Sequence, residues 1–127
     1  MREAAIEALS FPAPFGLTVR FAMKANPTRT VLRLFDSMGI CIDASSGFEA
    51  SRAISAGIAG DRILLTAQEL PGNLKGLLGS GVGFNACSLR QLEEFGKAFR
   101  SGTLGLRLNL GVGSGFSDKT KVAGSQA

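Results

Sequence analysis

Short apolar runs alternate with longer amphipathic stretches along most of this chain. Five runs have the composition of β-strands and begin about 21 residues apart, a spacing that suits one strand, one helix and two short loops. The runs are LTVRFAM (17–23), GICIDA (39–44), RILLTA (62–67), GVGFNAC (81–87) and LGLRLNL (104–110).

The stretches between these runs carry apolar residues at helical spacing. Ser46 and Glu49 have the S-x-x-E spacing of a capping box at the start of the second predicted helix. Ser88 and Gln91 repeat this arrangement at the start of the fourth. Gly39 is placed to end the first helix. Two internal glycines make the third helix the weakest. The predicted helices lie within 28–39, 46–57, 69–81 and 88–99.

Strictly alternating strands and helices predict an α/β fold with a parallel sheet and right-handed crossovers. A doubly wound open sheet and a (β/α)8 barrel both satisfy this pattern, and the nearly constant spacing favours the barrel. A complete barrel takes ~250 residues, whereas this chain has 127 and five βα units. Five strands would leave two exposed sheet edges. We therefore expect residues 1–127 to form an incomplete barrel domain.

Polar residues occupy the carboxyl ends of the predicted strands, where α/β proteins gather their chemistry. They are Lys24, Asp43, Thr66, Asn85, Arg107 and Asn109.

The alternation of the first run predicts where its lysine lies. Arg20, Ala22 and Lys24 should point toward the barrel axis, because Val19, Phe21 and Met23 would then face the covering helices. Burying an ammonium group is costly unless it is paired, neutralised or used covalently. Pro27 biases Asn26 away from helical geometry and fixes the position of the turn.

Each of these residues also has an explanation without chemistry. Lys24 could extend into solvent or pair with Asp43. Arg107 could anchor Asp43 as an ion pair. The capping box accounts for Glu49 without a ligand.

Composition narrows the functional classes. Hydrophobic residues make up 45% and charged residues 19% of the chain, which is typical of a globular protein. The net charge of +4 is scattered, and all nine aromatic residues are Phe, which argues against a nucleic-acid surface. Histidine is absent, and Cys41 and Cys87 lack metal-ligand spacing, so we expect two reduced, buried thiols and no metal site. No signal peptide or membrane span is expected, which favours a cytoplasmic location.

Four motifs follow one another in an order that resembles a known family. They are FAMKANP (21–27), VLRLFDSMGICIDASSGFEASRAISAGI (31–58), DRILLTA (61–67) and LGLRLNLGVGSGFSDKTKVAGSQA (104–127). Together they are similar to the fold-type III pyridoxal-phosphate decarboxylases, the ornithine/diaminopimelate/arginine decarboxylase group. Residues 107–124 look most like the diaminopimelate branch. The resemblance implies a partial (β/α)8 TIM-type barrel of the alanine racemase-like kind.

The resemblance assigns a role to each of four residues. Lys24 would carry pyridoxal 5'-phosphate as an internal Schiff base, and Asp43 would lie close to that lysine. Glu49 would pair with the pyridine nitrogen of the cofactor, and Arg107 would be a pocket residue. A lysine attacks an aldehyde as the free amine, which a desolvated barrel mouth would favour by lowering its pKa. One carboxylate can hardly serve both the cap and the cofactor, so the two roles of Glu49 are alternatives.

The resemblance also predicts what this chain lacks. The remaining barrel units, the glycine-rich phosphate cradle and the C-terminal β-domain of the family have no counterpart here. We therefore expect the chain as given to be inactive, and the whole protein to be a homodimer that decarboxylates an amino acid, most simply meso-diaminopimelate to lysine. Phe21 and Phe116 stand where the family has Tyr and His.

Other interpretations remain open at this stage. The substrate could be ornithine, arginine or lysine, or the chain could be a non-catalytic homologue that acts through protein contacts. The alanine-racemase side of the fold fits the strand-five motif less well. Nucleotide binding is disfavoured, because Phe116 occupies the last glycine position of a G-x-G-x-x-G pattern and Asp118 precedes Lys119 where a P-loop needs glycine.

Overall fold

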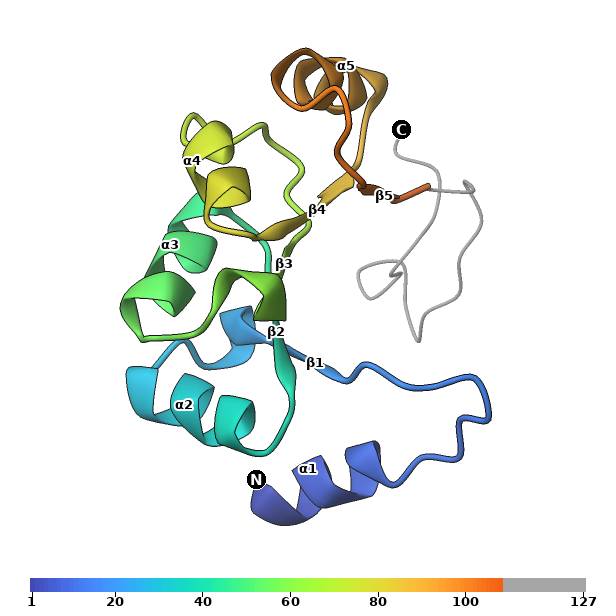
Figure 1. Cartoon of the computed structure of the whole chain (residues 1–127). Coiled ribbons are helices and arrows are strands. Elements are labelled where there is room, and N and C mark those ends of the chain that lie inside the picture. The colour runs from blue at the N-terminus through green and yellow to red at the C-terminus, as the bar shows by residue number, and fades with distance from the viewer. Residues whose placement is uncertain (109–127) are drawn as a thin grey trace, which may run out of the picture.

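The computed structural model describes residues 1–108, so Asn109 and the glycine run after it lie outside the described residues. The described chain alternates strands and helices after an initial helix, with two short 3-10 turns (Figure 1). The elements are α1 (Arg2–Leu9), β1 (Arg20–Ala22), η1 (Met23–Ala25), α2 (Arg29–Ser37), β2 (Cys41–Ala44), α3 (Gly47–Ser55), η2 (Gly60–Arg62), β3 (Ile63–Leu65), α4 (Leu74–Gly79), β4 (Gly83–Ala86), α5 (Leu89–Ala98) and β5 (Gly105–Leu106).

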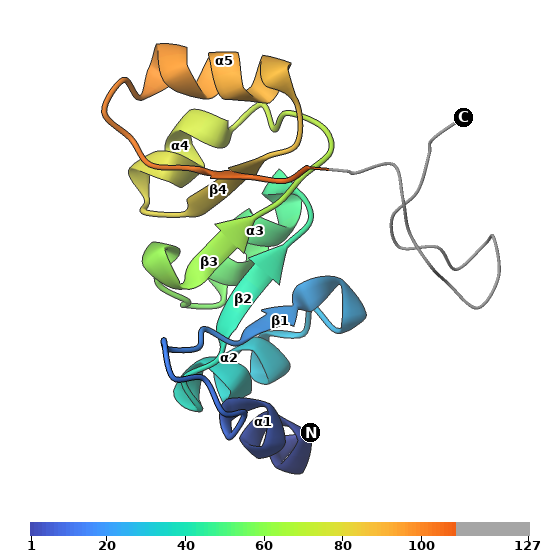
Figure 2. The ribbon, with the colours of Figure 1, turned by 90° about the vertical axis from the view of Figure 1, so that its right-hand side faces the viewer.

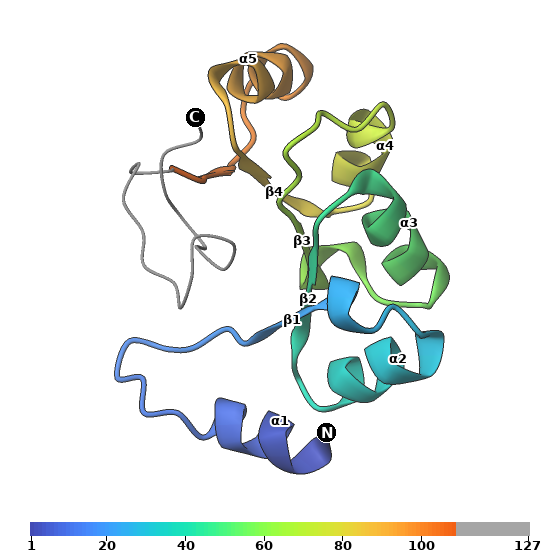
Figure 3. The same cartoon turned by 180° about the vertical axis from the view of Figure 1, so that it is seen from behind.

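The five strands form a parallel sheet in the order β1-β2-β3-β4-β5. Helices α2, α3, α4 and α5 all cover the same face of this sheet, and the strands turn progressively from β1 to β5 (Figures 1 and 3). A doubly wound sheet would reverse its strand order and carry helices on both faces. Sequential order with one helical layer is instead the geometry of a barrel wall, which confirms the predicted architecture.

The core lies between the sheet and its helices. Strands β2, β3 and β4 alternate half-buried and buried residues, because one face of the sheet meets helices and the other is open. Figure 2 shows these strands from the side. Ile42, Leu65 and Phe84 are almost fully buried on the helical side. Cys41 and Cys87 are only half-buried. The prediction that both thiols are buried is therefore wrong in degree, because Cys41 occupies a half-buried position of β2 and Cys87 follows the end of β4.

The N-terminal helix α1 was not among the predicted elements. Its Ala5 is buried in a small second cluster with Phe35 and Ile40, near the β1 edge of the sheet. The connection from α1 to β1, residues 10–19, runs outward on the open side (Figure 1). The strand–helix alternation that marks the rest of the chain does not extend over residues 1–19, so the spacing of apolar residues predicts no helix there.

Helix α2 ends as Gly39 predicts. Gly39 has a positive φ of 87°, and the backbone N–H of Ile40 returns to the carbonyl of Phe35 at 3.0 Å. This is a Schellman-type ending, in which a residue in the left-handed region reverses the chain and an aliphatic residue follows into the core. The chain therefore passes from the end of α2 into β2 through a short turn.

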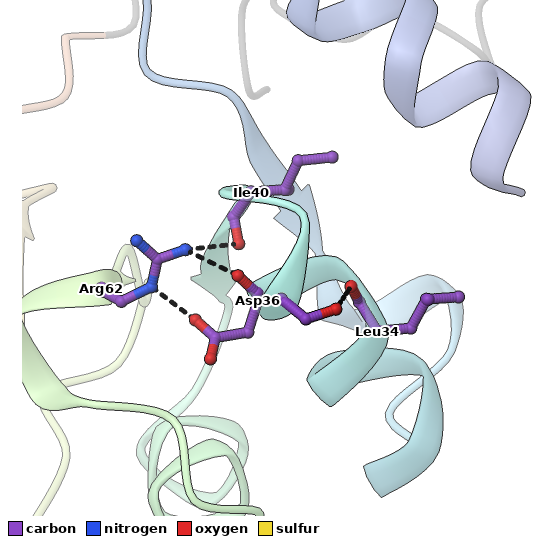
Figure 4. Close-up of polar contacts among 5 residues, drawn as sticks. Leu34, Asp36, Ile40 and Arg62 are labelled. Atoms are coloured by element: carbon purple, nitrogen blue, oxygen red, sulfur yellow. Dashed lines mark hydrogen bonds and ion pairs between the residues drawn. The ribbon is translucent and has the colours of Figure 1, made fainter.

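An ion pair joins the amino ends of two βα units. Arg62, at the end of η2, donates through Nε to the Asp36 carboxylate and through its terminal nitrogen to the carbonyls of Asp36 and Ile40, both at 3.3 Å (Figure 4). The Arg62 and Asp36 side chains are about one-third exposed. The contact ties the end of α2 to the start of β3, at the edge opposite the candidate site.

Candidate active site

The carboxyl ends of neighbouring strands bring their polar side chains together, as the sequence predicts. Asn85 donates from Nδ2 to Thr66 Oγ1 at 3.0 Å, which joins β4 to the exit of β3. Gly105 of β5 pairs with Asn85 of β4, and a Cβ atom on residue 105 would collide with Asn85 Oδ1. Glycine at position 105 therefore leaves room for the amide of Asn85 beside the strand.

A cleft of about 890 Å³ lies at this edge of the sheet. A volume of several hundred Å³ suits a cofactor-sized ligand. The exit of β3 and the connection to α4 supply most of the wall. The turn η1, the β2–α3 turn with the start of α3, and the residue that follows β5 contribute the rest. The lining residues are Lys24, Ser45, Ser46, Gly47, Phe48, Thr66, Ala67, Gln68, Glu69, Leu70, Pro71, Gly72, Asn73 and Arg107.

Lys24 lines this cleft but does not continue β1. The strand ends at Ala22, and Lys24 lies in the 3-10 turn η1, between the fully buried Met23 and the extended Asn26. Asn26 has φ −159° and ψ 97°, which confirms the effect expected of the following Pro27. Lys24 is exposed, so residues 1–108 do not provide the desolvation predicted for this amine.

Asp43 lies within β2, where it pairs with Ala22 of β1, and it is not among the residues that line the cleft. Burial raises the pKa of the Asp43 carboxyl, and the negative charge of Glu49 acts in the same direction. The positive charges of Arg20, Lys24 and Arg107 oppose this rise. Asp43 therefore lies within the field of all three other predicted site residues.

Glu49 and Ser46 form the N–H to hydroxyl bond that the capping box predicts, but the Glu49 carboxylate reaches back to Ser45, one residue beyond the N-cap. The Glu49 N–H donates to Ser46 Oγ at 3.2 Å, and Glu49 Oε2 accepts from the backbone N–H of Ser45 at 2.6 Å. The carboxylate thus fixes the β2–α3 turn, where Ser45 and Ser46 line the cleft. Its predicted pairing with a cofactor nitrogen stays a prediction.

Arg107 follows β5 and lines the same cleft as Lys24. Its backbone N–H donates to the carbonyl of Ala86 at 2.9 Å, which holds it in register with β4. Within residues 1–108 the ion pairs are Arg62–Asp36 and Lys97–Glu94. Neither Lys24 nor Arg107 is therefore neutralised by a direct ion pair to Asp43 in this part of the chain, and both present cationic groups to the cleft.

Sequence reasoning missed most of the cleft wall. The connection formed by residues 66–73 contributes eight lining residues, and the exposed ring of Phe48 adds an aromatic group. The only signal in the sequence was that this segment follows a predicted strand. Across the described chain no group of three or more His, Cys, Asp or Glu side chains could hold a metal ion. None of the described helices is long and apolar enough to cross a membrane.

Comparison with curated proteins finds diaminopimelate decarboxylases. The enzyme of Streptomyces coelicolor is 34% identical over 114 residues, covering 86% of this chain and 26% of the relative. The Escherichia coli K12 enzyme is 32% identical over 114 residues, with 86% and 27% coverage. The chain thus spans about a quarter of the length of these relatives.

Solved structures share the fold. Diaminopimelate decarboxylase from Helicobacter pylori, complexed with L-lysine, superposes with a TM-score of 0.73 at 20% identity, covering 87% of this chain and 30% of that one. Lysine/ornithine decarboxylase from Vibrio vulnificus, complexed with putrescine, gives a TM-score of 0.70 at 24% identity, with 92% and 31% coverage.

The family itself follows from a match over nearly the whole chain. The model of the pyridoxal-binding domain of pyridoxal-dependent decarboxylases covers residues 3–126, and it agrees with the parallel βα wall and with the predicted resemblance. The chain belongs to the pyridoxal-binding domain family of the pyridoxal-dependent decarboxylases.

Proposed function

We propose that this chain forms one part of the active site of a pyridoxal-phosphate-dependent amino-acid decarboxylase, and that Lys24 is the residue that binds the cofactor covalently. The observation that carries the proposal is the position of Lys24 at the carboxyl end of β1, lining a cofactor-sized cleft together with Arg107. Primary amines at the carboxyl edge of a barrel are well placed to react with an aldehyde.

The groups in the cleft fit this cofactor. Lys24 offers an amine for the aldehyde carbon, and Arg107 offers a guanidinium for an anionic group, either the phosphate or a substrate carboxylate. Ser45 and Thr66 add hydroxyl groups along the wall. When bound, pyridoxal phosphate supplies an electron sink for the electron pair left behind as CO2 departs.

Asp43 would act from beneath the cleft. Its carboxyl lies within the field of Lys24 and has a raised pKa because of burial, so it can hold or release a proton close to the amine. The positive charges of Arg20, Lys24 and Arg107 oppose this rise. We propose that Asp43 sets the proton occupancy around Lys24 rather than contacting the substrate.

Glu49 has two candidate roles that substitution can separate. Its Oε2 is engaged with the N–H of Ser45, which favours a role in fixing the turn beside the cleft. The pairing of its charge with the pyridine nitrogen is the alternative that the family resemblance implies. A glutamine at this position would keep the hydrogen-bond acceptor and remove the charge.

The proposed substrate is meso-diaminopimelate, converted to lysine and CO2, because the curated relatives quoted above carry that activity in their names. Lysine or ornithine is the second candidate, favoured by the likeness to lysine/ornithine decarboxylase. Since the chain spans about a quarter of its relatives, we propose that residues 1–127 alone are inactive. We further propose that the whole protein is a cytoplasmic homodimer.

The test is a comparison of substrates on the whole protein that contains this chain, loaded with pyridoxal phosphate. Release of CO2 should be faster from meso-diaminopimelate than from ornithine, arginine or lysine, and Lys24→Ala should abolish it. Faster release from ornithine or lysine would move the assignment to the second candidate. No release from any of these amino acids would favour a non-catalytic homologue.

A further inference from the structure

We propose that Gln91 is a positioning residue for the cleft, which holds the β3–α4 connection (residues 66–73) in place from the neighbouring βα unit. Gln91 does not line the cleft, whereas every residue of the connection does. The anchoring role of the Gln91 hydrogen bonds does not depend on whether the protein binds the cofactor. Their consequence for Lys24 rests on the proposed function.

Gln91 is the buried polar side chain of the described chain, with 2% of its surface exposed. Its Oε1 accepts from the backbone N–H of Cys87 at 2.6 Å. Its Nε2 donates to the carbonyl of Ala67 at 2.9 Å and to that of Gln68 at 3.0 Å. The acceptor and the amino group of this side chain are thus both used, as burial requires.

The two capping boxes of the chain differ at this residue in a way that explains the choice of side chain. Glu49 and Gln91 both accept from the backbone N–H four residues earlier, at Ser45 and Cys87. A carboxylate can do no more than accept, but an amide also donates through its amino group. Gln91 therefore completes its own cap and still reaches two carbonyls of another connection.

The connection is held at Thr66 by the carbonyl of Ala44 and the amide of Asn85, and Gln91 fixes the two residues that follow. The connection precedes α4, a helix of six residues with an internal glycine and a terminal one. Its far end is held by Asn73, whose Nδ2 donates to Ser51 Oγ at 3.0 Å on the surface of α3. Gly47 lies so close to Pro71 that a Cβ would approach it within 2.8 Å. Gln91 supplies the buried anchor at the near end.

Gln91→Glu tests this role because it preserves length and the acceptor for Cys87. It also places a carboxylate oxygen opposite the carbonyls of Ala67 and Gln68, where an attractive contact becomes repulsive. By hydrogen exchange, we expect protection of the Thr66 and Leu74 amides, which donate to Ala44 and Pro71 at the two ends of the connection, to fall at least about tenfold. Protection in β2 and β3 should change less than about threefold. Acidification should restore the protection, because a protonated Glu can donate to one carbonyl. Arg90→Ala, an exposed change on the same helix, is the control.

The second readout is chemical. With pyridoxal phosphate and borohydride, the rate of covalent capture at Lys24 should fall about tenfold in Gln91→Glu and stay unchanged in Arg90→Ala, because a displaced wall no longer orients the aldehyde. A loss of protection that is uniform over the sheet would overturn the positioning role. So would an unchanged capture rate in a folded variant.

If Gln91→Glu does not fold, the unmodified chain still decides the matter by NMR. The side-chain amide protons of Gln91 should exchange much more slowly than those of the exposed Gln68, and equal rates would contradict the proposal. The two proposals also fail differently. If Lys24 is not captured even in the unmodified chain while the exchange effect stays confined to the Thr66 and Leu74 amides, the cofactor assignment fails and the anchoring of the connection stands.

Discussion

Lys24 and Arg107 line one cleft although they follow the first and the last strands of the described sheet. Each strand end contributes a cationic group, and Asp43 of β2 lies within the field of both. The juxtaposition results from the curvature of the parallel sheet, which turns its carboxyl edge around a common centre (Figure 1). Neither group forms an ion pair within residues 1–108, and two such cations at one edge attract an anionic ligand.

Substitution of Glu49 separates its cap from its charge. Glu49→Gln keeps an acceptor for the N–H of Ser45, so its free energy of unfolding should stay within about 0.5 kcal/mol of the unmodified chain. Glu49→Ala removes the acceptor and should lower it by about 1 kcal/mol. Urea unfolding measures both values.

The same pair of variants then tests the role implied by the family. If Glu49 acts only through the turn, the activity of the whole protein should survive Glu49→Gln and fall in Glu49→Ala. A loss of about a hundredfold or more in Glu49→Gln, with normal stability, would instead establish that the charge itself acts on the cofactor.

Removing the charge of Arg20 and removing the charge of Glu49 should shift the pKa of Asp43 in opposite directions. NMR of the Asp43 side chain should give a pKa above the ordinary value of 3.8 for this group. Arg20→Ala should raise that pKa further, and Glu49→Gln should lower it, because the first removes an opposing positive charge and the second removes a like charge. Shifts of the same sign in both variants would contradict the arrangement of charges around the cleft.

The raised pKa of Asp43 also predicts a pH dependence of stability. The folded chain holds the Asp43 proton more tightly than the unfolded chain, so this group stabilises the fold most below pH 3.8. The contribution is lost as pH rises through the folded pKa. Asp43→Asn should therefore gain stability relative to the unmodified chain as pH increases over this window, which urea unfolding at several pH values would measure. A gain on acidification would contradict the assignment.

The Arg62 contact should contribute to stability but not to chemistry. Arg62→Ala removes the ion pair to Asp36 and the hydrogen bonds to two carbonyls, and should lower the free energy of unfolding by about 1–2 kcal/mol. Arg33→Ala, an exposed change on α2, is the control and should cost less than about 0.5 kcal/mol. An equal effect of the two substitutions would show that the contact in Figure 4 contributes nothing specific.

Much of this architecture could be predicted from the sequence because it depends on local patterns. The strand–helix spacing gives the parallel order, and both capping boxes form the hydrogen bonds that Ser46 and Ser88 predict. Gly39 ends its helix in the expected conformation. In each case the deciding interactions lie within a few residues of one another, so the sequence carries them directly.

The remainder depends on contacts between distant segments. The 3-10 turn at Lys24, the wall formed by residues 66–73 and the bonds of Gln91 to Ala67 and Gln68 have no local signature. Lys24 is exposed within residues 1–108, and the shielding of a barrel mouth comes from elements other than the strand that carries the residue, so the predicted desolvation of its amine stays a prediction. The sequence therefore predicted a lysine at the carboxyl end of the first strand, but not the residues that surround it.

The most direct test of the account is covalent capture of pyridoxal phosphate by the chain. Incubation followed by borohydride reduction, digestion and mass analysis should find the phosphopyridoxyl group on the peptide that contains Lys24, and Lys24→Arg should remove it. Lys75, an exposed lysine outside the cleft, serves as the internal control for nonspecific reaction. Equal labelling of Lys24 and Lys75 in the folded chain, or none at Lys24, would contradict the central claim.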